Sequence, residues 1–480
     1  MEKESRDMKK EKKFLEKGKN GMEKGKIVLP LLSVLLVLSS LGMKAQGTLF
    51  EDAFEATENM RVGWNLGNTL DSNSGDTLNM WIERWNVLRN PSDYEKAWGQ
   101  PITTKALIKM FKDAGFNAIR VPVTWYPHME AKFAFDGSSS SAYWYPSQDD
   151  IGTKVKSNWM KRVKEIVNYV VSQGMYCILN VHHDTGAANT AWLEASEEGY
   201  AKSKERYEEL WRQIAEEFKN YNEKLLFEAY NEMLDSYDSW CFASFATPAK
   251  YNATVAASAY NAINAYAQSF VDVVRSTGGN NLQRNLIIST YGACSGAGNW
   301  NAHLKDPLKN LDLPNDVAEG QHIIFEVHSY PNISNLANAK NEVKEMMKTL
   351  QTHLVSKGAP VIIGEWGSSE LEKDYENNRT NMTAFAKDFE EQAKKYGFTT
   401  FYWMGLSDRA DRSSLKWTQP EIKDAIITGY YGEGGYTAIH YPSVEEDTCN
   451  EEPYYDILGR PVYNPSPGIY IWKGKKVVLK

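Results

Sequence analysis

Two glutamates stand at the ends of short apolar segments, where they could act together as a proton donor and a nucleophile. Glu232 ends the segment Leu225–Glu232, and Glu365 lies near the end of Pro360–Trp366. A carboxylate in such a place costs free energy to bury, and it often only pairs with a cation of a neighbouring loop. Two carboxyl groups about 5–5.5 Å apart, however, are what hydrolysis of a glycosidic bond with retained configuration requires. One is protonated and donates to the leaving oxygen, and the other is ionised and attacks the anomeric carbon.

Two neighbouring polar residues fit this division of roles. Arg120 would hold a nearby carboxylate such as Glu365 ionised by its positive charge, with a simple ion pair at the edge of the core as the alternative. Asn231 directly precedes Glu232 and could hydrogen-bond the 2-hydroxyl of a sugar, a contact that strengthens in the transition state. Both residue types therefore favour support of the two glutamates.

Histidines and aromatic residues leave further chemistry open. His328 and Tyr330 are two residues apart on one predicted strand, so their side chains share a face and could orient the carboxylates. The adjacent pair His182 and His183 could bind a metal, but neighbouring side chains of a strand face opposite sides, so we expect no metal centre. Trp403 offers a flat apolar face to a sugar ring or to the core.

The elements that must position these groups alternate between short apolar runs and amphipathic segments. This alternation predicts an α/β fold with a parallel sheet, and eight such units fit a (β/α)8 TIM barrel. The predicted strands are Arg61–Asn68, Asn117–Trp125, Met175–His183, Leu225–Glu232, Asn285–Tyr291, His322–Tyr330, Pro360–Trp366 and Thr399–Leu406. The predicted helices include Thr103–Ala114, Asn158–Gln173, Ser203–Asn220, Thr254–Ser276, Ala337–Lys357, Asn378–Tyr396 and Gln419–Ile427.

Polar residues gather at the ends of these strands and not at their beginnings. A barrel carries its chemistry at the C-terminal ends of its strands, so this asymmetry is the main evidence for a site. Two long loops, Leu70–Gln100 and Tyr126–Ser157, are rich in tryptophan and tyrosine and are predicted to lie on the same face. Their aromatic side chains could form platforms for sugars.

The composition is that of a large folded chain. It has 480 residues, of which 42% are hydrophobic and 24% charged, and this excludes a disordered chain or a small disulfide-stapled domain. A net charge of −8 argues against a nucleic-acid partner. The 4 cysteines contain no C-x-x-C pair, which argues against a zinc site, although one bridge between Cys241 and Cys294 stays open. No serine-hydrolase elbow or phosphate-binding loop is present, and nothing indicates an oligomeric state.

The two ends of the chain differ from its middle. Residues 1–45 read as a signal peptide with a basic beginning and an apolar stretch, Ile27–Met43, that is shorter than the roughly 20 residues of a membrane span. We expect cleavage near Ala45 and no stable membrane span afterwards. Residues 46–447 form the predicted catalytic domain, and residues 448–480 form a tail of short strands separated by glycine and proline turns. This tail could also be a last hairpin of the main domain.

The tail resembles the C-terminal sorting motif of type IX secretion cargo in Bacteroidetes. The resemblance rests on Asp456-x-x-Gly459-Arg460-x-Val462, Gly468-Ile-Tyr470 and the terminal Lys475-Lys-Val-Val-Leu-Lys480. It implies a secreted protein that is released or held at the outer cell surface.

The middle of the chain resembles glycoside hydrolase family 5, and the likeness covers about Phe50 to Ile427. The motifs that carry it are Gly63-Trp-Asn-Leu-Gly-Asn68, Gly115-Phe-Asn-Ala-Ile-Arg120, Leu179-Asn-Val-His182-His183, Phe227-Glu-Ala-Tyr-Asn231-Glu232, His328-Ser-Tyr330, Ile363-Gly-Glu365-Trp-Gly367 and Tyr402-Trp403. One departure is Met233, where many members have proline after the acid/base glutamate, and it leaves the preferred glucan open.

The resemblance implies a role for each matching residue. Glu232 is implied as the acid/base and Glu365 as the nucleophile. The implied catalytic support is Arg120, His182, Asn231, His328 and Tyr330, and the implied sugar-binding residues are Asn68, Asp71, His183 and Trp403.

The expected activity is that of a secreted endo-glycosidase that cuts internal β-1,4 bonds of a cellulose-like β-glucan with retention of configuration. No cofactor is expected, because acid, nucleophile and ring distortion suffice. A xyloglucan or mixed-linkage glucan hydrolase is the alternative, with a mannanase behind it. A surface glycan-binding protein without catalysis is the alternative from another class, against which the intact Glu232 and Glu365 argue.

Overall fold

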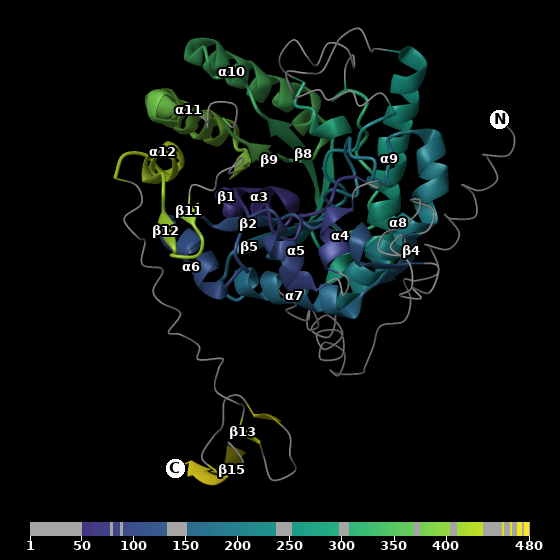
Figure 1. Cartoon of the computed structure of the whole chain (residues 1–480), viewed down its shortest axis with the longest axis vertical. Coiled ribbons are helices and arrows are strands. Elements are labelled where there is room, and N and C mark those ends of the chain that lie inside the picture. Colours follow the sequence, from purple (N-terminus) through teal and green to yellow (C-terminus); the bar gives the residue numbers. More distant parts are fainter. Residues whose placement is uncertain are drawn as a thin grey trace, which may run out of the picture. The chain divides into compact units, whose positions relative to one another are not determined.

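Eight parallel strands close into a barrel, as the sequence predicts. The computed structural model describes residues 50–76, 80–86, 90–131, 151–236, 252–296, 307–368, 375–403, 410–434, 454–455, 461–462, 468–472 and 475–479. Around the barrel the strand order is β1-β10-β9-β8-β7-β6-β5-β2 (Figure 1). The strands are β1 (Val62–Asn65), β2 (Ala118–Val121), β5 (Tyr176–Asn180), β6 (Leu225–Glu228), β7 (Leu286–Ser289), β8 (Ile323–Ser329), β9 (Val361–Trp366) and β10 (Thr399–Tyr402).

Helices surround this barrel, and each predicted helix is present with shifted ends (Figure 1). α8 begins earlier than predicted, because Ser196 caps it and its first turn, with Glu197 and Glu198, is polar and gives no apolar period. Between β7 and β8 the described residues contain only a short 3-10 turn, η6 (Tyr291–Ala293). The helices are α6 (Lys105–Ala114), α7 (Ser157–Val171), α8 (Glu197–Phe218), α9 (Ala253–Ser276), α10 (Leu336–His353), α11 (Tyr375–Tyr396) and α12 (Pro420–Tyr431).

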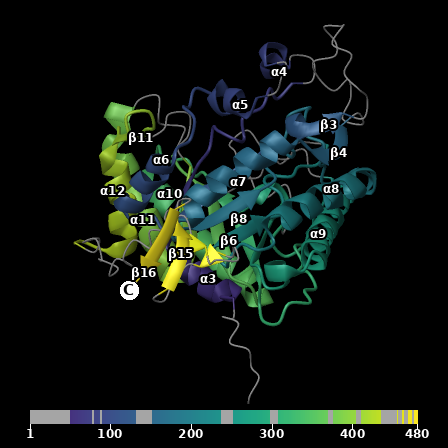
Figure 2. The ribbon, with the colours of Figure 1, turned by 90° about the horizontal axis from the view of Figure 1, so that it is seen from below.

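A short helix that the sequence did not reveal, α3 (Ala53–Met60), packs against the interior of the barrel. A reciprocal pair of side-chain caps between Asp52 and Glu55 starts it. Its buried face is in one apolar cluster with inward-facing residues of the strands, among them Ile178 and Phe401. Figure 2 shows α3 at one end of the barrel and α4 (Trp81–Trp85) with α5 (Pro91–Ala97) at the other. One end is therefore filled by a helix, which leaves the other for a ligand.

The two long loops carry small elements of their own. The first contains α4 and α5, and the second contains the hairpin of β3 (Met129–Ala131) and β4 (Ile151–Val155). The predicted platform Tyr143-Trp144-Tyr145 lies outside the described residues.

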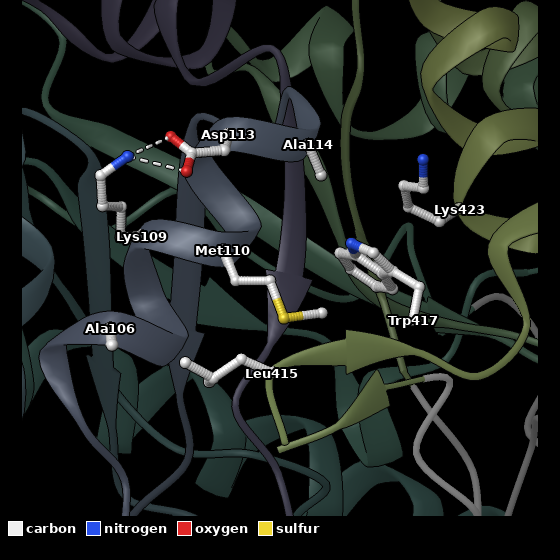
Figure 3. Close-up of a pocket in the computed structure, with 8 residues that line it drawn as sticks. All are labelled: Ala106, Lys109, Met110, Asp113, Ala114, Leu415, Trp417 and Lys423. Carbon is white, nitrogen blue, oxygen red and sulfur yellow. Dashed lines mark hydrogen bonds and ion pairs between the residues drawn. The ribbon is translucent and has the colours of Figure 1, made fainter. Parts of the chain in front are cut away.

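A hairpin of β11 (Ala410–Asp411) and β12 (Lys416–Trp417) follows β10 and borders a groove of about 540 Å³ on α6. Figure 3 shows the Met110 side chain directed between Leu415 and Trp417, with the ion pair of Lys109 and Asp113 beside it. None of the predicted site residues lines this groove, so it is separate from the site that the sequence predicts.

The tail forms the predicted short strands. β13 (Tyr454–Tyr455), β14 (Pro461–Val462), β15 (Gly468–Trp472) and β16 (Lys475–Leu479) make an antiparallel sheet in the order β14-β13-β15-β16. Residues 1–45 lie outside the described residues, and within the described part no helix has the length and apolar character needed to cross a bilayer.

A buried carboxyl group ties α11 to the strands behind the site. The Glu390 side chain is fully buried and accepts a hydrogen bond from the hydroxyl of Thr400, which itself accepts one from the Trp366 indole at 3.0 Å. Burial raises the pKa of Glu390 from 4.5 to about 8. The folded protein therefore holds this proton more tightly than the unfolded chain does.

Replacing Glu390 by glutamine is expected to make unfolding less dependent on pH. In the wild type, the stability that this site contributes is complete below about pH 4.5 and is lost as the pH rises through about 8. Glu390→Gln keeps the size and a hydrogen-bond acceptor but cannot ionise. Thermal unfolding at pH 5 and pH 9 should show a fall for the wild type that is smaller in the variant, at about 1.4 kcal/mol for each unit of pKa shift. An equal fall in both proteins would contradict this reading of Glu390.

Candidate active site

The C-terminal ends of the strands bring most of the predicted polar side chains together around one arginine. Arg120, on β2, is completely buried. Its Nη1 donates to Glu365 Oε1 at 2.8 Å and to Asn65 Oδ1 at 3.0 Å, and its Nη2 donates to Asn231 Oδ1 at 2.7 Å. Nε and Nη2 also bind the two oxygens of Glu228, each at 2.7 Å. The predicted contact between Arg120 and Glu365 is thus present, within a larger set of contacts.

Glu365 is held by donors on both of its oxygens. Besides the contact with Arg120, its Oε2 accepts a hydrogen bond from the hydroxyl of Tyr330 at 2.8 Å. Charged and hydroxyl donors of this kind favour the ionised carboxylate. The side chain is 5% exposed, so its unused lone pairs are close to solvent or to a bound ligand. The arrangement suits a nucleophile.

Glu232 has a different environment. Its Oε1 lies 2.6 Å from His328 Nδ1. Burial raises the pKa of Glu232 to about 7, even though the hydrogen bond and the charge of His328 act in the opposite direction. A carboxyl group with this pKa carries a proton in a large fraction of molecules near neutral pH and can give it up, which suits a general acid.

The two glutamates face each other closely enough to act on one bond. One oxygen of Glu232, one oxygen of Glu365 and a ring nitrogen of His328 all lie within 4.8 Å of one another. His328 Nδ1 is also 3.6 Å from Glu365 Oε2, so one nitrogen of the imidazole faces both carboxyl groups. This spacing agrees with the roughly 5–5.5 Å found in retaining glycosidases and falls short of the 6.5–9.5 Å of inverting ones.

The predicted orientation of His182 and His183 is wrong. Their rings are in edge-to-face contact with centroids 4.5 Å apart, because both residues follow the end of β5 at Asn180, where the alternation of a strand no longer applies. With Asp71 they form a group whose ligand atoms come within 4.8 Å of one another. The orientation of these two histidines therefore does not exclude a bound metal. The absence of a metal stays a prediction.

Asp71 supports the turn that follows β1. It is fully buried, and its two oxygens accept hydrogen bonds from the backbone N–H groups of Asn68 at 3.0 Å and Thr69 at 2.7 Å. These bonds stabilise the turn, in which Asn68 adopts a φ of 57°. The oxygens thus bind the backbone that carries Asn68, and the contact of Asp71 with sugar stays a prediction.

Aromatic side chains border the cluster. Trp403 is half-buried and lies nearly parallel to His182 with ring centroids 5.8 Å apart. Gly67 lies against the Trp403 indole, since a Cβ at this position would come within 2.6 Å of the ring. From the first long loop, Trp98 approaches His183 with ring centroids 5.6 Å apart. The loop therefore reaches the site, as predicted.

Sequence reasoning missed two buried glutamates of the site. Glu228 ends β6 four residues before Glu232 and binds Arg120, and Glu326 on β8 lies two residues before His328. Both are fully buried, and they were not singled out because each lies inside an apolar run. The period of two along a strand places Glu326 on the same face as His328 and was the available signal.

Comparison with known proteins gives a consistent result. The sequence model of the cellulase family (glycosyl hydrolase family 5) matches residues 79–407. The chain is 31% identical over 435 residues to Endoglucanase A of Clostridium longisporum, in an alignment that covers 84% of this chain and 70% of the relative.

Two solved structures are also similar. A GH5-4 broad specificity endoglucanase from an uncultured bacterium is 50% identical, with a TM-score of 0.69 and coverage of 80% of this chain and 97% of the other. A glycoside hydrolase family 5 enzyme from Prevotella bryantii, determined in complex with a xyloglucan tetradecasaccharide, is 36% identical, with a TM-score of 0.65 and coverage of 80% and 99%. The chain therefore belongs to glycoside hydrolase family 5, and it is a glycoside hydrolase of the endoglucanase type.

Proposed function

We propose that this protein is an extracellular endo-β-1,4-glucanase that hydrolyses cellulose-like β-glucan in two displacement steps, with Glu365 as the nucleophile and Glu232 as the acid/base. The observation that carries the proposal is the opposite environment of the two glutamates. Arg120 and Tyr330 donate to Glu365, whereas burial raises the pKa of Glu232 to about 7. Such a pair of different carboxyl groups is the requirement for retaining hydrolysis.

In the first step, Glu365 attacks the anomeric carbon while Glu232 gives its proton to the leaving oxygen. A covalent glycosyl ester forms and the glycosidic bond breaks. The Asn231 amide is bound to Arg120 through its Oδ1 at 2.7 Å, which leaves its N–H groups for the sugar 2-hydroxyl. Arg120 and Tyr330 hold Glu365 in place for this attack.

In the second step, Glu232 acts as a base toward water, which attacks the anomeric carbon and releases Glu365. His328 supports the change of role, because its Nδ1 is 2.6 Å from Oε1 of the carboxyl group that loses and regains the proton. The product keeps the configuration of the substrate after two inversions.

The range of substrates is proposed as β-1,4-linked glucans, with xyloglucan and mixed-linkage glucan as the alternative. The support is the broad specificity named for the 50% identical endoglucanase and the xyloglucan fragment bound by the Prevotella bryantii enzyme. A decorated chain such as xyloglucan needs an open cleft. Trp98 and Trp403 offer flat faces along such a cleft.

Secretion is part of the proposal and rests on the sequence of the two ends. Residues 1–45 have the pattern of a signal peptide, and the tail has the order of elements of a type IX sorting motif. A polysaccharide is too large to enter a cell, so an enzyme that cuts it internally has its substrate outside.

Changing either glutamate to glutamine is expected to lower kcat on a soluble β-glucan by several orders of magnitude. Each change removes one group from a two-group reaction, and a positioned acid alone contributes about 10²–10⁴-fold. Glu58→Gln is the control, because Glu58 is an exposed residue of α3. Reducing-end release measures the rate, and NMR of the first product formed by the wild type should show the β-anomer. Full activity in Glu232→Gln or Glu365→Gln, or an α-anomer, would contradict the mechanism.

A panel of purified polysaccharides tests the proposed substrates. Carboxymethyl cellulose, xyloglucan and mixed-linkage β-glucan should each lose viscosity early, with few reducing ends released, because cleavage is internal. Trp403→Ala should raise KM on all three through the loss of a stacking face. Cleavage of mannan alone would contradict the proposal.

Removal of the tail tests the secretion proposal. Deletion of residues 448–480 is expected to leave the rate on soluble glucan unchanged, since the barrel carries every residue of the proposed mechanism. In a bacterium with type IX secretion, the same deletion should retain the protein inside the cell envelope. Export without the tail would contradict the sorting role, and loss of folding would make the tail part of the domain.

A further inference from the structure

A third carboxyl group lies behind the catalytic pair. Glu326 is on β8, two residues before His328, so both side chains face the interior of the barrel. It is completely buried, and its Oε2 accepts a hydrogen bond from the Ser289 hydroxyl at 2.5 Å. Its Oε1 faces Arg120 Nε at 3.3 Å and His328 Nε2 at 3.6 Å.

The backbone leaves room for this side chain. A Cβ on residue 364 would lie 1.6 Å from Glu326 Oε1, so only a glycine fits beside the carboxylate. Gly364 directly precedes Glu365 on β9. Glu326 therefore packs against β9 beside Gly364, next to the proposed nucleophile. Contacts from β2, β7, β8 and β9 fix its position.

The ring of His328 lies between two carboxylates. Nδ1 is 2.6 Å from Glu232 Oε1, and on the opposite side Nε2 faces Glu326. Burial alone would lower the pKa of His328, but the charge of Glu365, the hydrogen bond to Glu232 and the nearby carboxylate of Glu326 raise it to about 10. An imidazolium donates from both nitrogens, so it can face both carboxyl groups at once.

We propose that Glu326 is a positioning residue of this active site: from behind the ring it holds His328 in its doubly protonated form, with Nδ1–H directed at Glu232. This inference rests on the proposed role of Glu232 as the acid/base. The arrangement extends the site from a pair of glutamates to the series Glu326, His328, Glu232. Its function is to keep a positive charge beside the carboxyl group that loses a proton in the first step.

Glu326 can hold this role because it remains ionised. Although burial favours its neutral form, the charges of Arg120 and His328 keep the pKa of Glu326 below its ordinary value. Charged and titratable groups from several elements face His328 and its two carboxyl partners. They are Arg120 from β2, His182 after β5, Glu228 from β6, Tyr330 after β8 and Glu365 from β9. The neutral hydroxyl of Ser289, from β7, also contacts Glu326.

The consequence concerns the alkaline limit of activity. His328 opposes the effect of burial on the pKa of Glu232 by its charge and its hydrogen bond. Without the Glu326 charge, His328 is expected to lose its proton close to the pH at which Glu232 titrates, and Glu232 then keeps its own proton to a higher pH. The alkaline limb of kcat/KM should therefore move to higher pH, while the general base of the second step is impaired.

Glu326→Gln is the test, because it keeps the size of the side chain and removes its charge. The His328 ring signals in NMR should titrate about 3 pH units lower in this variant than in the wild type, because one partner of a buried ion pair is removed. The ring is then partly neutral where Glu232 titrates, so the alkaline limb of kcat/KM should move upward by about 1 pH unit, and kcat should fall about tenfold or more. Glu326→Asp, which retains the charge, should keep the limb near its wild-type position even if kcat falls. Glu390→Gln, a change at a buried glutamate outside the site, should leave the limb in place.

A purely structural role for Glu326 would lower kcat in both Glu326 variants without moving the limb or the His328 titration, and this result would overturn the inference. If Glu326→Gln fails to fold, the His328 ring signals of the wild-type protein are the second measurement. They should show a doubly protonated ring at pH 7, and a neutral ring at this pH would overturn the inference. The NMR titration does not depend on activity. An NMR titration that contradicts this inference therefore leaves the proposed function intact, because the activities of Glu232→Gln and Glu365→Gln test that function separately.

Discussion

The active site depends on a guanidinium group that is held without contact to bulk water. Burial would lower the pKa of Arg120, but the carboxylates of Glu228, Glu326 and Glu365 raise it well above its ordinary value. A buried cation is tolerated only when its donors are satisfied, and those of Arg120 reach residues on several strands. The barrel therefore fixes Arg120, and Arg120 fixes Glu365 and Asn231. Removing it would leave several carboxyl groups buried without their cation.

The proposed reaction depends on how the positive and negative side chains are arranged around Arg120. Three acids lie near one fixed positive charge, and His328 supplies the second positive charge on the side of Glu232. Glu365, the proposed nucleophile, has the direct contact with Arg120. Glu232, the proposed acid/base, has its hydrogen bond with His328, and burial raises its pKa to about 7. One barrel thus gives two glutamates different environments within a few ångströms of each other.

The sequence predicted the barrel and the meeting of Glu232 and Glu365 at one end of it, because both leave regular signals. Apolar runs that end in polar residues predicted the strands and the position of Glu232 and Glu365. The sequence did not predict α3, whose apolar face is too short to give a period, nor the supporting carboxyl groups Glu228 and Glu326, which lie inside apolar runs. The error on His182 and His183 has a related cause, since strand alternation was applied beyond the end of the strand.

Residues such as Asp71 show what a sequence cannot supply. A resemblance by motif places this acid near the sugar, but only the structure reveals that its oxygens accept backbone N–H groups in the turn after β1. The central claim, that Glu365 is the ionised nucleophile, has one direct measurement. Incubation with an activated 2-deoxy-2-fluoro-cellobioside, followed by mass spectrometry of peptides, should find the sugar attached to Glu365. Attachment to Glu232 or to another carboxylate would contradict the account.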